Sequence, residues 1–336
     1  MKKAAMVVST FYQKNRLFDR SDPISNKDDC LYSFYALRQA FLSHEVDLST
    51  QDVNPLPESD IVIFNDMPRT LPEKRPGQRF YLLALESIAV HPANFDQRRY
   101  ALFDKVFTWK DDIIDKSKVV KINYAFLFPL QQNSSAGART RMVCLMANNK
   151  TSFHPGELYS KRVEILDWFE QHHPADIDLY GGGWDGFIPR SFLGKIVQRS
   201  RLGTIVPKHR HYSFYRGIAS PKLPMLRNYR FNVCYENVRD VPGYITEKIF
   251  DCFFTGCVPI YWGAGNITDH IPGNCFIDKR KFGTYEALYQ YLKDMDPAAY
   301  TRYLTNIDAF LRSPRSAPFT ADHFARTIVH EVMSTT

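Results

Sequence analysis

The sequence predicts an α/β protein with two successive doubly wound, Rossmann-type domains, and three observations lead to this prediction. The chain has 336 residues, and at this length two domains of about 150 residues are expected. Short apolar strand-like runs alternate with amphipathic helical patterns in both halves, as in parallel sheets with crossover helices. A polar stretch at residues 131–141 separates the two series and suits a hinge.

The first half has four apolar runs that we expect to be strands and one strong helical pattern. The helical pattern covers residues 30–43, where apolar side chains recur at helical spacing. Together these elements form the expected N-terminal domain, residues 1–135. The strands are expected at residues 4–9, 59–64, 80–85 and 102–109.

The second half begins a new series of strands and helices. Its expected domain is residues 140–300, and the helices of residues 301–336 are expected to pack back on the first domain. The strands are expected at residues 142–147, 177–180, 231–235 and 258–263. Helices are expected at residues 157–172, from Tyr244 onward, and at residues 285–295, 298–311 and 321–333.

The composition is that of an ordinary globular protein with a modest excess of positive charge. Hydrophobic residues make up 44% of the chain, and 43 Lys and Arg against 36 Asp and Glu give a net charge of +7. Such an excess suits an anionic small molecule, a nucleic acid or an anionic membrane surface. Because the chain has no arginine-rich tract or basic helical stripe, we expect no nucleic-acid partner.

The cysteine pattern and the lack of a long apolar run indicate the cellular compartment of the protein. The six cysteines are scattered and form no C-x-x-C pair, so free thiols in a reducing compartment are expected. No stretch approaches the roughly 20 apolar residues of a membrane span, and the N-terminal apolar run reads as a first strand. We therefore expect a cytoplasmic protein without a transmembrane segment, and peripheral contact with the inner membrane stays open.

Residues 229–282 are the most informative part of the chain. Glu236 and Asn237 follow an apolar strand, and Tyr244, Glu247 and Lys248 follow a Pro-Gly turn at a predicted helix start. Parallel α/β sheets bind nucleotides at this edge. A diphosphate would be attracted there by free backbone N–H groups, by the helix dipole and by Lys248. Taken alone, a Glu-Lys pair at a helix start is more often a solvated surface.

The helix predicted from Tyr244 has an apolar and a polar face, as its spacing shows. Its polar face is expected to include Asp251, whose side chain we expect to be solvated. The apolar face consists of Ile245, Ile249, Cys252, Phe253 and Gly256. The polar face consists of Tyr244, Glu247, Lys248 and Asp251.

The ordered combination of motifs makes this segment specific. Tyr-Glu-Asn after a strand, Gly-Tyr-Ile-Thr-Glu-Lys opening a helix and Val-Pro-Ile-Tyr-Trp-Gly as the next strand closely resemble the donor-binding signature of the α-1,3/4-fucosyltransferases. That family is glycosyltransferase family 10, and the likeness is to its bacterial type. The resemblance is strong over residues 229–282 and faint before residue 131.

The resemblance implies a fold and a reaction. The fold would be GT-B, with the active site in the cleft between an acceptor-binding N-terminal domain and a GDP-fucose-binding C-terminal domain. The reaction would be inverting transfer of L-fucose from GDP-fucose to a GlcNAc or glucose hydroxyl of a lactosamine-type glycan, in α-1,3 or α-1,4 linkage. Two alternatives stay open: a GT-B enzyme for another nucleotide sugar, and an inactive sugar-nucleotide or glycan-binding protein.

The same resemblance assigns roles to the donor-side residues. Asn237 and Tyr244 would shape the nucleoside and sugar sites, and Glu247 would accept hydrogen bonds from ribose hydroxyls. Lys248 would lie against the diphosphate or the fucose, and Glu236 is placed with these residues.

Negative charge that develops on the β-phosphate must be met by a metal or by fixed cations. The family typically relies on Arg and Lys, so no obligatory cofactor is expected, although Mn²⁺ or Mg²⁺ could stimulate. Arg216 is the predicted phosphate-binding arginine, with Arg210 as its rival. Asp176 and Asp178 spell D-x-D, but they precede a strand and read as a polar turn.

Glu86 is the predicted catalytic base. Transfer needs a group that takes the proton of the acceptor hydroxyl. Glu86 follows the apolar strand at 80–85, and the family has its base at a matching point, before a Pro-containing segment. Here the proline is delayed to Pro92, which leaves a solvated or helix-capping glutamate as the alternative. Glu236 is the reserve candidate for the base.

Overall fold

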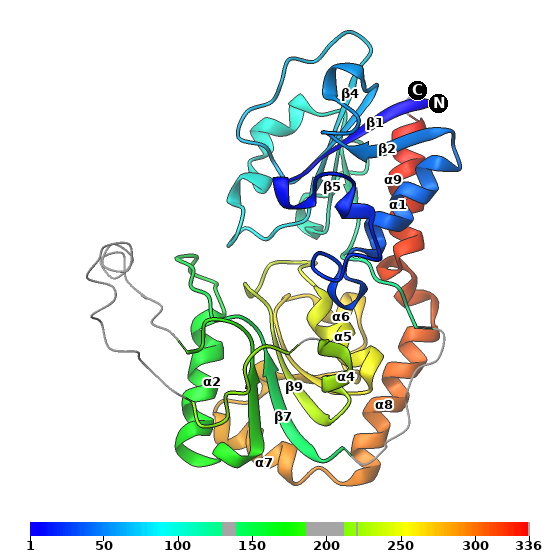
Figure 1. The fold of residues 1–336 in the computed structure, drawn as a ribbon. Helices are drawn as coiled ribbons and strands as arrows, with labels where there is room; N and C mark the ends of the chain where they lie inside the picture. The colour runs from blue at the N-terminus through cyan, green and yellow to red at the C-terminus, as the bar shows by residue number, and fades with distance from the viewer. Residues whose placement is uncertain (130–138, 186–211, 220, 335–336) are drawn as a thin grey trace, which may run out of the picture.

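The computed structural model describes residues 1–129, 139–185, 212–219 and 221–334, which fold into two lobes. Figure 1 shows one lobe in blue and cyan and the other in green to orange, each built on a twisted sheet. The last helix returns to the first lobe, so both chain ends lie there.

The sheet of the N-terminal lobe has six parallel strands in the order β2-β1-β3-β4-β5-β6. Its central strands are buried on both faces, as the continuous apolar runs of the sequence predicted. The strands are β1 Lys2–Val7, β2 Val46–Thr50, β3 Ile61–Asn65, β4 Arg79–Ala84, β5 Lys105–Thr108 and β6 Val119–Lys121.

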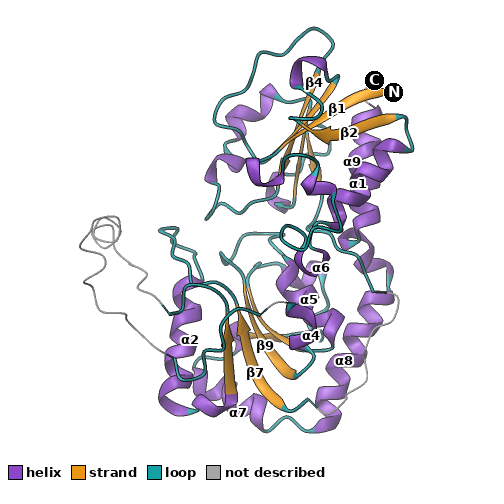
Figure 2. Cartoon of the chain, viewed as in Figure 1, coloured by secondary structure: helices purple, strands orange, loops and turns teal. Residues whose placement is uncertain are grey.

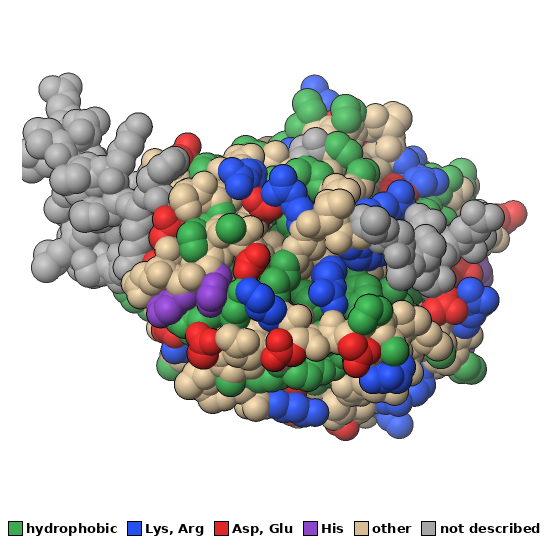
Figure 3. All heavy atoms as spheres, turned by 90° about the horizontal axis from the view of Figure 1, so that it is seen from below, with side chains coloured by type: hydrophobic (Ala, Val, Ile, Leu, Met, Phe, Trp, Pro, Cys, Tyr) green, Lys and Arg blue, Asp and Glu red, His purple; other side chains and the backbone are tan. Residues whose placement is uncertain are grey.

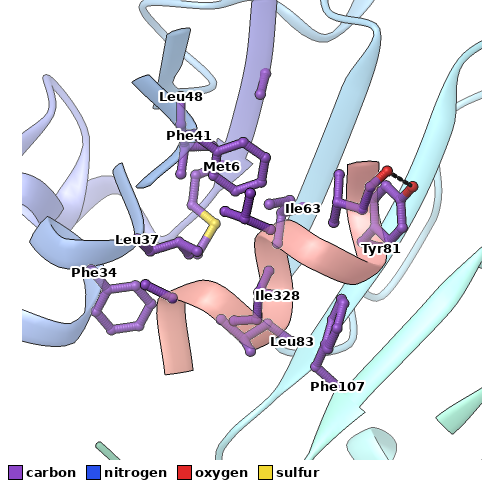
Figure 4. Close-up of a cluster of buried hydrophobic side chains, with 14 of the residues drawn as sticks. Met6, Phe34, Leu37, Phe41, Leu48, Ile63, Tyr81, Leu83, Phe107 and Ile328 are labelled. Carbon is purple, nitrogen blue, oxygen red and sulfur yellow. Dashed lines mark hydrogen bonds between the residues drawn. The ribbon is translucent and has the colours of Figure 1, made fainter. Parts of the chain in front are cut away.

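Two helices from opposite ends of the chain cover one face of this sheet. They are α1 (Tyr32–Leu42) and α9 (Ala321–Ser334), and they share one hydrophobic core. Figure 4 shows Ile328 of α9 among side chains from β1, β3 and β4. The Tyr81 hydroxyl donates a hydrogen bond to the Val332 carbonyl at 3.3 Å.

The sheet of the C-terminal lobe has five parallel strands in the order β11-β10-β9-β7-β8. Because β7 comes first in sequence but lies between β9 and β8, the direction of winding reverses between β7 and β9. The strands are β7 Arg141–Met146, β8 Ile177–Tyr180, β9 Tyr229–Tyr235, β10 Val258–Trp262 and β11 Ile277–Asp278.

Helices cover both faces of the second sheet (Figure 2). Side chains of α2 and α7 form the core on one face, and those of α4 and α5 form the core on the other. The helices of this lobe are α2 Tyr159–His172, α4 Lys222–Leu226, α5 Glu247–Thr255, α6 Ile267–His270, α7 Tyr285–Lys293 and α8 Pro297–Arg312.

The predicted domain boundary at residues 300 and 301 falls inside α8, whose apolar face packs on the C-terminal lobe. The expectation that residues 301–336 pack back on the first lobe holds for α9. It is wrong for residues 301–312 of α8, which pack on the C-terminal lobe. The predicted hinge at residues 131–141 lies largely outside the described residues. The strands β2, β6 and β11 were not predicted, because their segments are short or rich in polar side chains.

Charge is mixed on the face shown in Figure 3, where Lys and Arg side chains are interspersed with Asp and Glu. On that face the excess positive charge of the sequence is therefore not gathered into a continuous stripe. Across the described ranges, no helix has both the length and the apolar character that a membrane crossing requires.

Candidate active site

A cavity of about 320 Å³ lies at the carboxyl edge of the second sheet. Met146 at the end of β7 and Asn237 just after β9 both line it, so it opens where the winding of the sheet reverses. Open α/β sheets bind their ligands at such a point. The volume lies in the range of small-molecule sites.

The walls of this cavity are strongly basic. Among the described residues that line it, four side chains are cationic and one, Glu247, is a carboxylate. The cations are Lys150, Arg162, Lys222 and Lys248. An anionic ligand is therefore the kind that the cavity favours.

Arg162 is a buried cation without a carboxylate partner in the described part of the chain. Its side chain comes from α2 and is only 4% exposed. One guanidinium nitrogen, Nη2, donates to the carbonyls of Tyr235 and Glu236 at 2.6 and 2.9 Å and to Asn237 Oδ1 at 3.1 Å. Burial lowers the pKa of Arg162. Since a buried charge is costly unless it is paired, a bound anion is the natural counter-charge.

The sequence reasoning missed Arg162, although a signal was present. Arg162 stands three positions after Tyr159 and four before Leu166, on the apolar face of the predicted helix 157–172. A charged residue on a buried helix face needs a partner or a ligand.

Lys248 is held in place by two carboxylates. Its Nζ lies 3.1 Å from Glu236 Oε2 and 3.2 Å from Glu247 Oε1, and it donates to Thr246 Oγ1 at 2.9 Å. Burial lowers the pKa of Lys248, but the Glu236 and Glu247 carboxylates outweigh burial and raise that pKa above its ordinary value. Lys248 therefore stays charged at the cavity wall, as the sequence predicted.

Glu236 supports this arrangement from behind. It is fully buried and does not line the cavity. Its Oε1 accepts the backbone N–H of Thr246 at 2.9 Å and its Oε2 accepts the Thr246 hydroxyl at 2.7 Å. Because both oxygens are occupied inside the protein, the reserve role of Glu236 as a base is wrong. Glu236 is connected to the cavity through its ion pair with Lys248.

Glu247 and Asn237 line the cavity, which agrees with their predicted place. The Glu247 side chain is 45% exposed. Burial raises the pKa of Glu247, but the ammonium groups of Lys248 and Lys222 outweigh burial and lower that pKa to about 2. The carboxylate is thus ionised at neutral pH and acts as a hydrogen-bond acceptor.

Tyr244 lies one layer behind the cavity. The helix α5 begins at Glu247, so Tyr244 belongs to the preceding loop and not to a polar helix face. It is 1% exposed, and its hydroxyl accepts a hydrogen bond from Asn237 Nδ2 at 3.2 Å. Its ring centroid lies 4.7 Å from that of Trp109, in the other lobe. Tyr244 therefore contacts the cavity through Asn237.

Arg216 is not brought to the cavity. Its Nε lies 2.6 Å from the buried Asp178 carboxylate, which also pairs with Arg141 and accepts the Tyr229 hydroxyl. Of the arginines that the structure describes, Arg162 lines the cavity and Arg216 does not. The rival candidate Arg210 lies outside the described residues.

The structure also corrects the expectation that the Asp251 side chain is solvated. Its side chain is 14% exposed and forms an ion pair with Lys222, so it is not solvated as expected. Burial raises the pKa of Asp251 to about 6, although the Lys222 ammonium opposes that shift. Because Lys222 lines the cavity, Asp251 positions a cation there.

Glu86 follows β4 at the carboxyl edge of the first sheet, as predicted. Its side chain is exposed, and no side chain in the described ranges hydrogen-bonds to its carboxylate. Residues 88–90 form a turn, so Glu86 caps no helix. Although the side chain reaches solvent, the surrounding protein partly desolvates the carboxylate and raises the pKa of Glu86, and the Asp66 and Glu247 carboxylates raise it further. The Glu86 carboxylate therefore interacts electrostatically with Glu247, a residue that lines the cavity of the other lobe.

The two lobes meet directly behind Glu86. The carbonyl of Leu85 accepts hydrogen bonds from Trp109 Nε1 at 2.7 Å and from the Tyr124 hydroxyl. Trp109 and Tyr244 belong to one buried cluster that crosses the junction. The backbone that carries Glu86 is therefore fixed against the loop that leads into α5.

A second contact locks the same junction. Asp111 Oδ2 accepts hydrogen bonds from Asn266 Nδ2 at 2.8 Å and from His270 Nε2 at 2.7 Å. Gly243 packs against this contact with a φ of +79°, and a Cβ there would lie 2.2 Å from the Trp109 carbonyl oxygen. Only glycine fits at this position.

Comparison with known proteins identifies the sequence family. The model of "Glycosyltransferase family 10 (fucosyltransferase) C-term" matches residues 136–310. An alpha-(1,4)-fucosyltransferase of Arabidopsis thaliana is 41% identical over 80 residues, which are 23% of this chain and 20% of that protein. The alpha-(1,3)-fucosyltransferase FucT of Helicobacter pylori is 35% identical over 72 residues, 21% of this chain and 15% of that protein. The chain thus spans at most about a fifth of the length of these curated relatives.

Comparison with solved structures identifies the fold. An alpha1,3-fucosyltransferase with GDP has a TM-score of 0.53 and 15% identity, over 90% of this chain and 81% of that chain. Anabaena Alr3699/HepE in complex with UDP-glucose has a TM-score of 0.56 and 11% identity, over 99% of this chain and 100% of that chain. The predicted GT-B fold is confirmed. At these identities the likeness concerns the fold alone.

Proposed function

Because the chain belongs to glycosyltransferase family 10, the fucosyltransferase family, we propose that it transfers L-fucose from GDP-fucose to a glycan hydroxyl. The transfer inverts the configuration at the fucose carbon. The observation that carries this proposal is the basic cavity beneath Asn237, Glu247 and Lys248, the residues of the family signature. A nucleoside diphosphate sugar offers the anionic charge that this cavity favours.

On the donor side, Arg162 and Lys248 hold the diphosphate. Arg162 has hydrogen-bonding capacity and no ion-pair partner in the described part of the chain, and Lys248 is fixed by Glu236 and Glu247. Preorganised cations of this kind stabilise the charge that develops on the leaving β-phosphate. We propose no obligatory metal, since these side chains supply that charge. Glu247 accepts hydrogen bonds from the ribose.

On the acceptor side, Glu86 takes the proton of the attacking hydroxyl. Its raised pKa makes it a stronger base than an ordinary glutamate, while it still has to be ionised to act. Transfer therefore decreases as the pH falls through that pKa. The acceptor that the family resemblance favours is a GlcNAc or glucose unit of a lactosamine-type glycan, with α-1,3 linkage ahead of α-1,4.

Two measurements test the proposal. In a competition experiment, GDP should displace a fluorescent GDP analogue at lower concentration than UDP or ADP. Preferred displacement by UDP would favour a GT-B enzyme for another nucleotide sugar, such as the UDP-glucose that HepE holds in its complex. In an acceptor screen, GDP-fucose should yield a fucosylated lactosamine. Donor binding without any transfer would favour an inactive binding protein.

A further inference from the structure

Lys150 stands in a segment that contacts both the donor cavity and the turn after the predicted base. It belongs to the segment after β7, whose green loops rise toward the N-terminal lobe in Figure 1. Two residues further, Ser152 Oγ donates a hydrogen bond to the carbonyl of Ala89 at 3.4 Å, which ties this segment to the turn after Glu86. Lys150 also lines the cavity.

The charges that surround Glu86 are mostly unfavourable to its ionised form. Asp66 faces it from the end of β3 and Glu247 from the start of α5, and both are carboxylates. Lys150 is the cation whose charge opposes them most strongly. The phenol groups of Tyr12, Tyr124 and Tyr159 also interact with the Glu86 carboxylate.

The Lys150 side chain can supply the positive charge that opposes these carboxylates. Its side chain is exposed, and it forms no ion pair with the residues that the structure describes. The other two lysines of the cavity are committed, since Lys222 pairs with Asp251 and Lys248 with Glu236 and Glu247. Lys150 is therefore the lysine of the cavity wall that forms no ion pair with a carboxylate within the described ranges.

A bound nucleoside diphosphate sugar would add negative charge next to Glu86. That charge favours the protonated carboxyl, which is unable to act as a base. A cation that lines the cavity and acts electrostatically on the base opposes this effect. We propose that Lys150 keeps the Glu86 carboxylate ionised while the anionic donor occupies the cavity, and so couples donor binding to the readiness of the base. This inference rests on the proposed function.

The pH profile of transfer tests the coupling. At saturating GDP-fucose, Lys150→Met should shift the acidic limb of the pH profile of kcat to higher pH by about one unit. A nearby opposite charge commonly shifts the pKa of a carboxyl group by that amount. Lys150→Arg should keep the wild-type limb. Lys161→Met is the matched control, because Lys161 is exposed on α2 and pairs only with Glu164 among the described residues. An unchanged acidic limb in Lys150→Met would overturn the proposal.

A second measurement decides the question without any transfer. The Glu86 carboxyl can be titrated by ¹³C NMR, with its resonance identified by its loss in Glu86→Gln. In the complex with GDP, the pKa of Glu86 should be higher in Lys150→Met than in the wild type. An equal pKa of Glu86 in the two complexes would contradict the role of Lys150. If the wild type transfers no fucose, the proposed function fails, and this titration still tests Lys150.

Discussion

The carboxyl edges of the two sheets are built in opposite ways. On the donor edge, Lys248, Glu236 and Thr246 form a closed set of hydrogen bonds, and Glu236 is fully buried. On the proposed acceptor edge, Glu86 is exposed, and among the described residues Asp66 and Asn94 hold it by hydrogen bonds to its backbone. The proposed donor site is thus preorganised by packing, whereas the proposed base at Glu86 interacts electrostatically with Lys150 and Glu247 of the opposite lobe.

This difference separates two kinds of residue. Changes on the donor edge should alter nucleotide affinity and stability together, because each side chain has several partners. Changes at Glu86 should lower the rate of the reaction and leave the nucleotide affinity and the stability of the fold unchanged. Four substitutions test this separation, from the largest expected effect to the smallest.

Replacing the base should have the largest effect. Glu86→Gln keeps the size and the backbone contacts of the residue but removes its ability to accept a proton. Loss of a general base typically costs about 10²- to 10⁴-fold, and kcat should fall by that factor. The affinity for GDP, measured by calorimetry, should stay within about twofold, as expected for a residue with little contact to the nucleotide. A large loss of GDP affinity would contradict the proposed separation between residues that bind the nucleotide and the residue that acts in the reaction.

Replacing Arg162 should weaken donor binding strongly. A hydrogen bond to a charged group contributes about 1.5–3 kcal/mol, so Arg162→Met should lower GDP affinity by about 10- to 100-fold. Arg216→Met is the matched control, since the Arg216 guanidinium binds Asp178 outside the cavity. Calorimetry on both variants decides between the two arginines. A larger loss in Arg216→Met would instead support Arg216 as the phosphate-binding residue.

The sequence predicted the site residues that lie close together along the chain and missed those that lie far apart or in irregular loops. Asn237, Glu247 and Lys248 stand close together in one segment with a regular strand-loop-helix pattern, and all three line the cavity. Arg162 lies 75 positions before its partner Asn237, so no local pattern joins them. Lys150 stands in an irregular loop, where periodicity gives no signal.

Errors within the well-predicted segment have a similar cause. The side-chain periodicity continues back to Tyr244, but the helix starts at Glu247 after the N-cap Thr246. Tyr244 is turned into the junction by its contact with Trp109, a residue of the other lobe. The burial of Glu236 likewise depends on packing between strands and the α5 start, which the chain order alone does not reveal. In the first lobe, β6 has only three residues, too few for a recognisable alternation.

The junction behind Glu86 should be sensitive to added bulk. In Gly243→Ala, the new methyl group would lie 2.2 Å from the Trp109 carbonyl oxygen, and the backbone has a φ of +79°. A strained backbone of this kind costs about 1–3 kcal/mol, and the clash adds to that cost. Gly77→Ala is the control, since its φ is +77° and nothing lies within 4 Å of the added carbon. Thermal unfolding should show the larger decrease in Tm for Gly243→Ala; equal decreases would argue against a tightly packed junction.

The smallest expected effect concerns the acid stability of the donor edge. The folded-state pKa of Glu247, about 2, is below its ordinary value of 4.5. The ionised group therefore stabilises the fold above pH 4.5, and this contribution is lost as the pH falls from 4.5 toward 2. Between about pH 6 and about pH 3, the decrease in Tm should be smaller in Glu247→Gln than in the wild type. An identical decrease in both proteins would show that Glu247 gains nothing from Lys248 and Lys222.

A crystal structure of the Glu86→Gln variant with GDP-fucose would test the central claim most directly, because this variant binds the donor without consuming it. We predict that the diphosphate contacts Arg162 and Lys248 between the ends of β7 and β9, with the fucose carbon turned toward position 86. A nucleotide bound anywhere else on the chain would contradict the account.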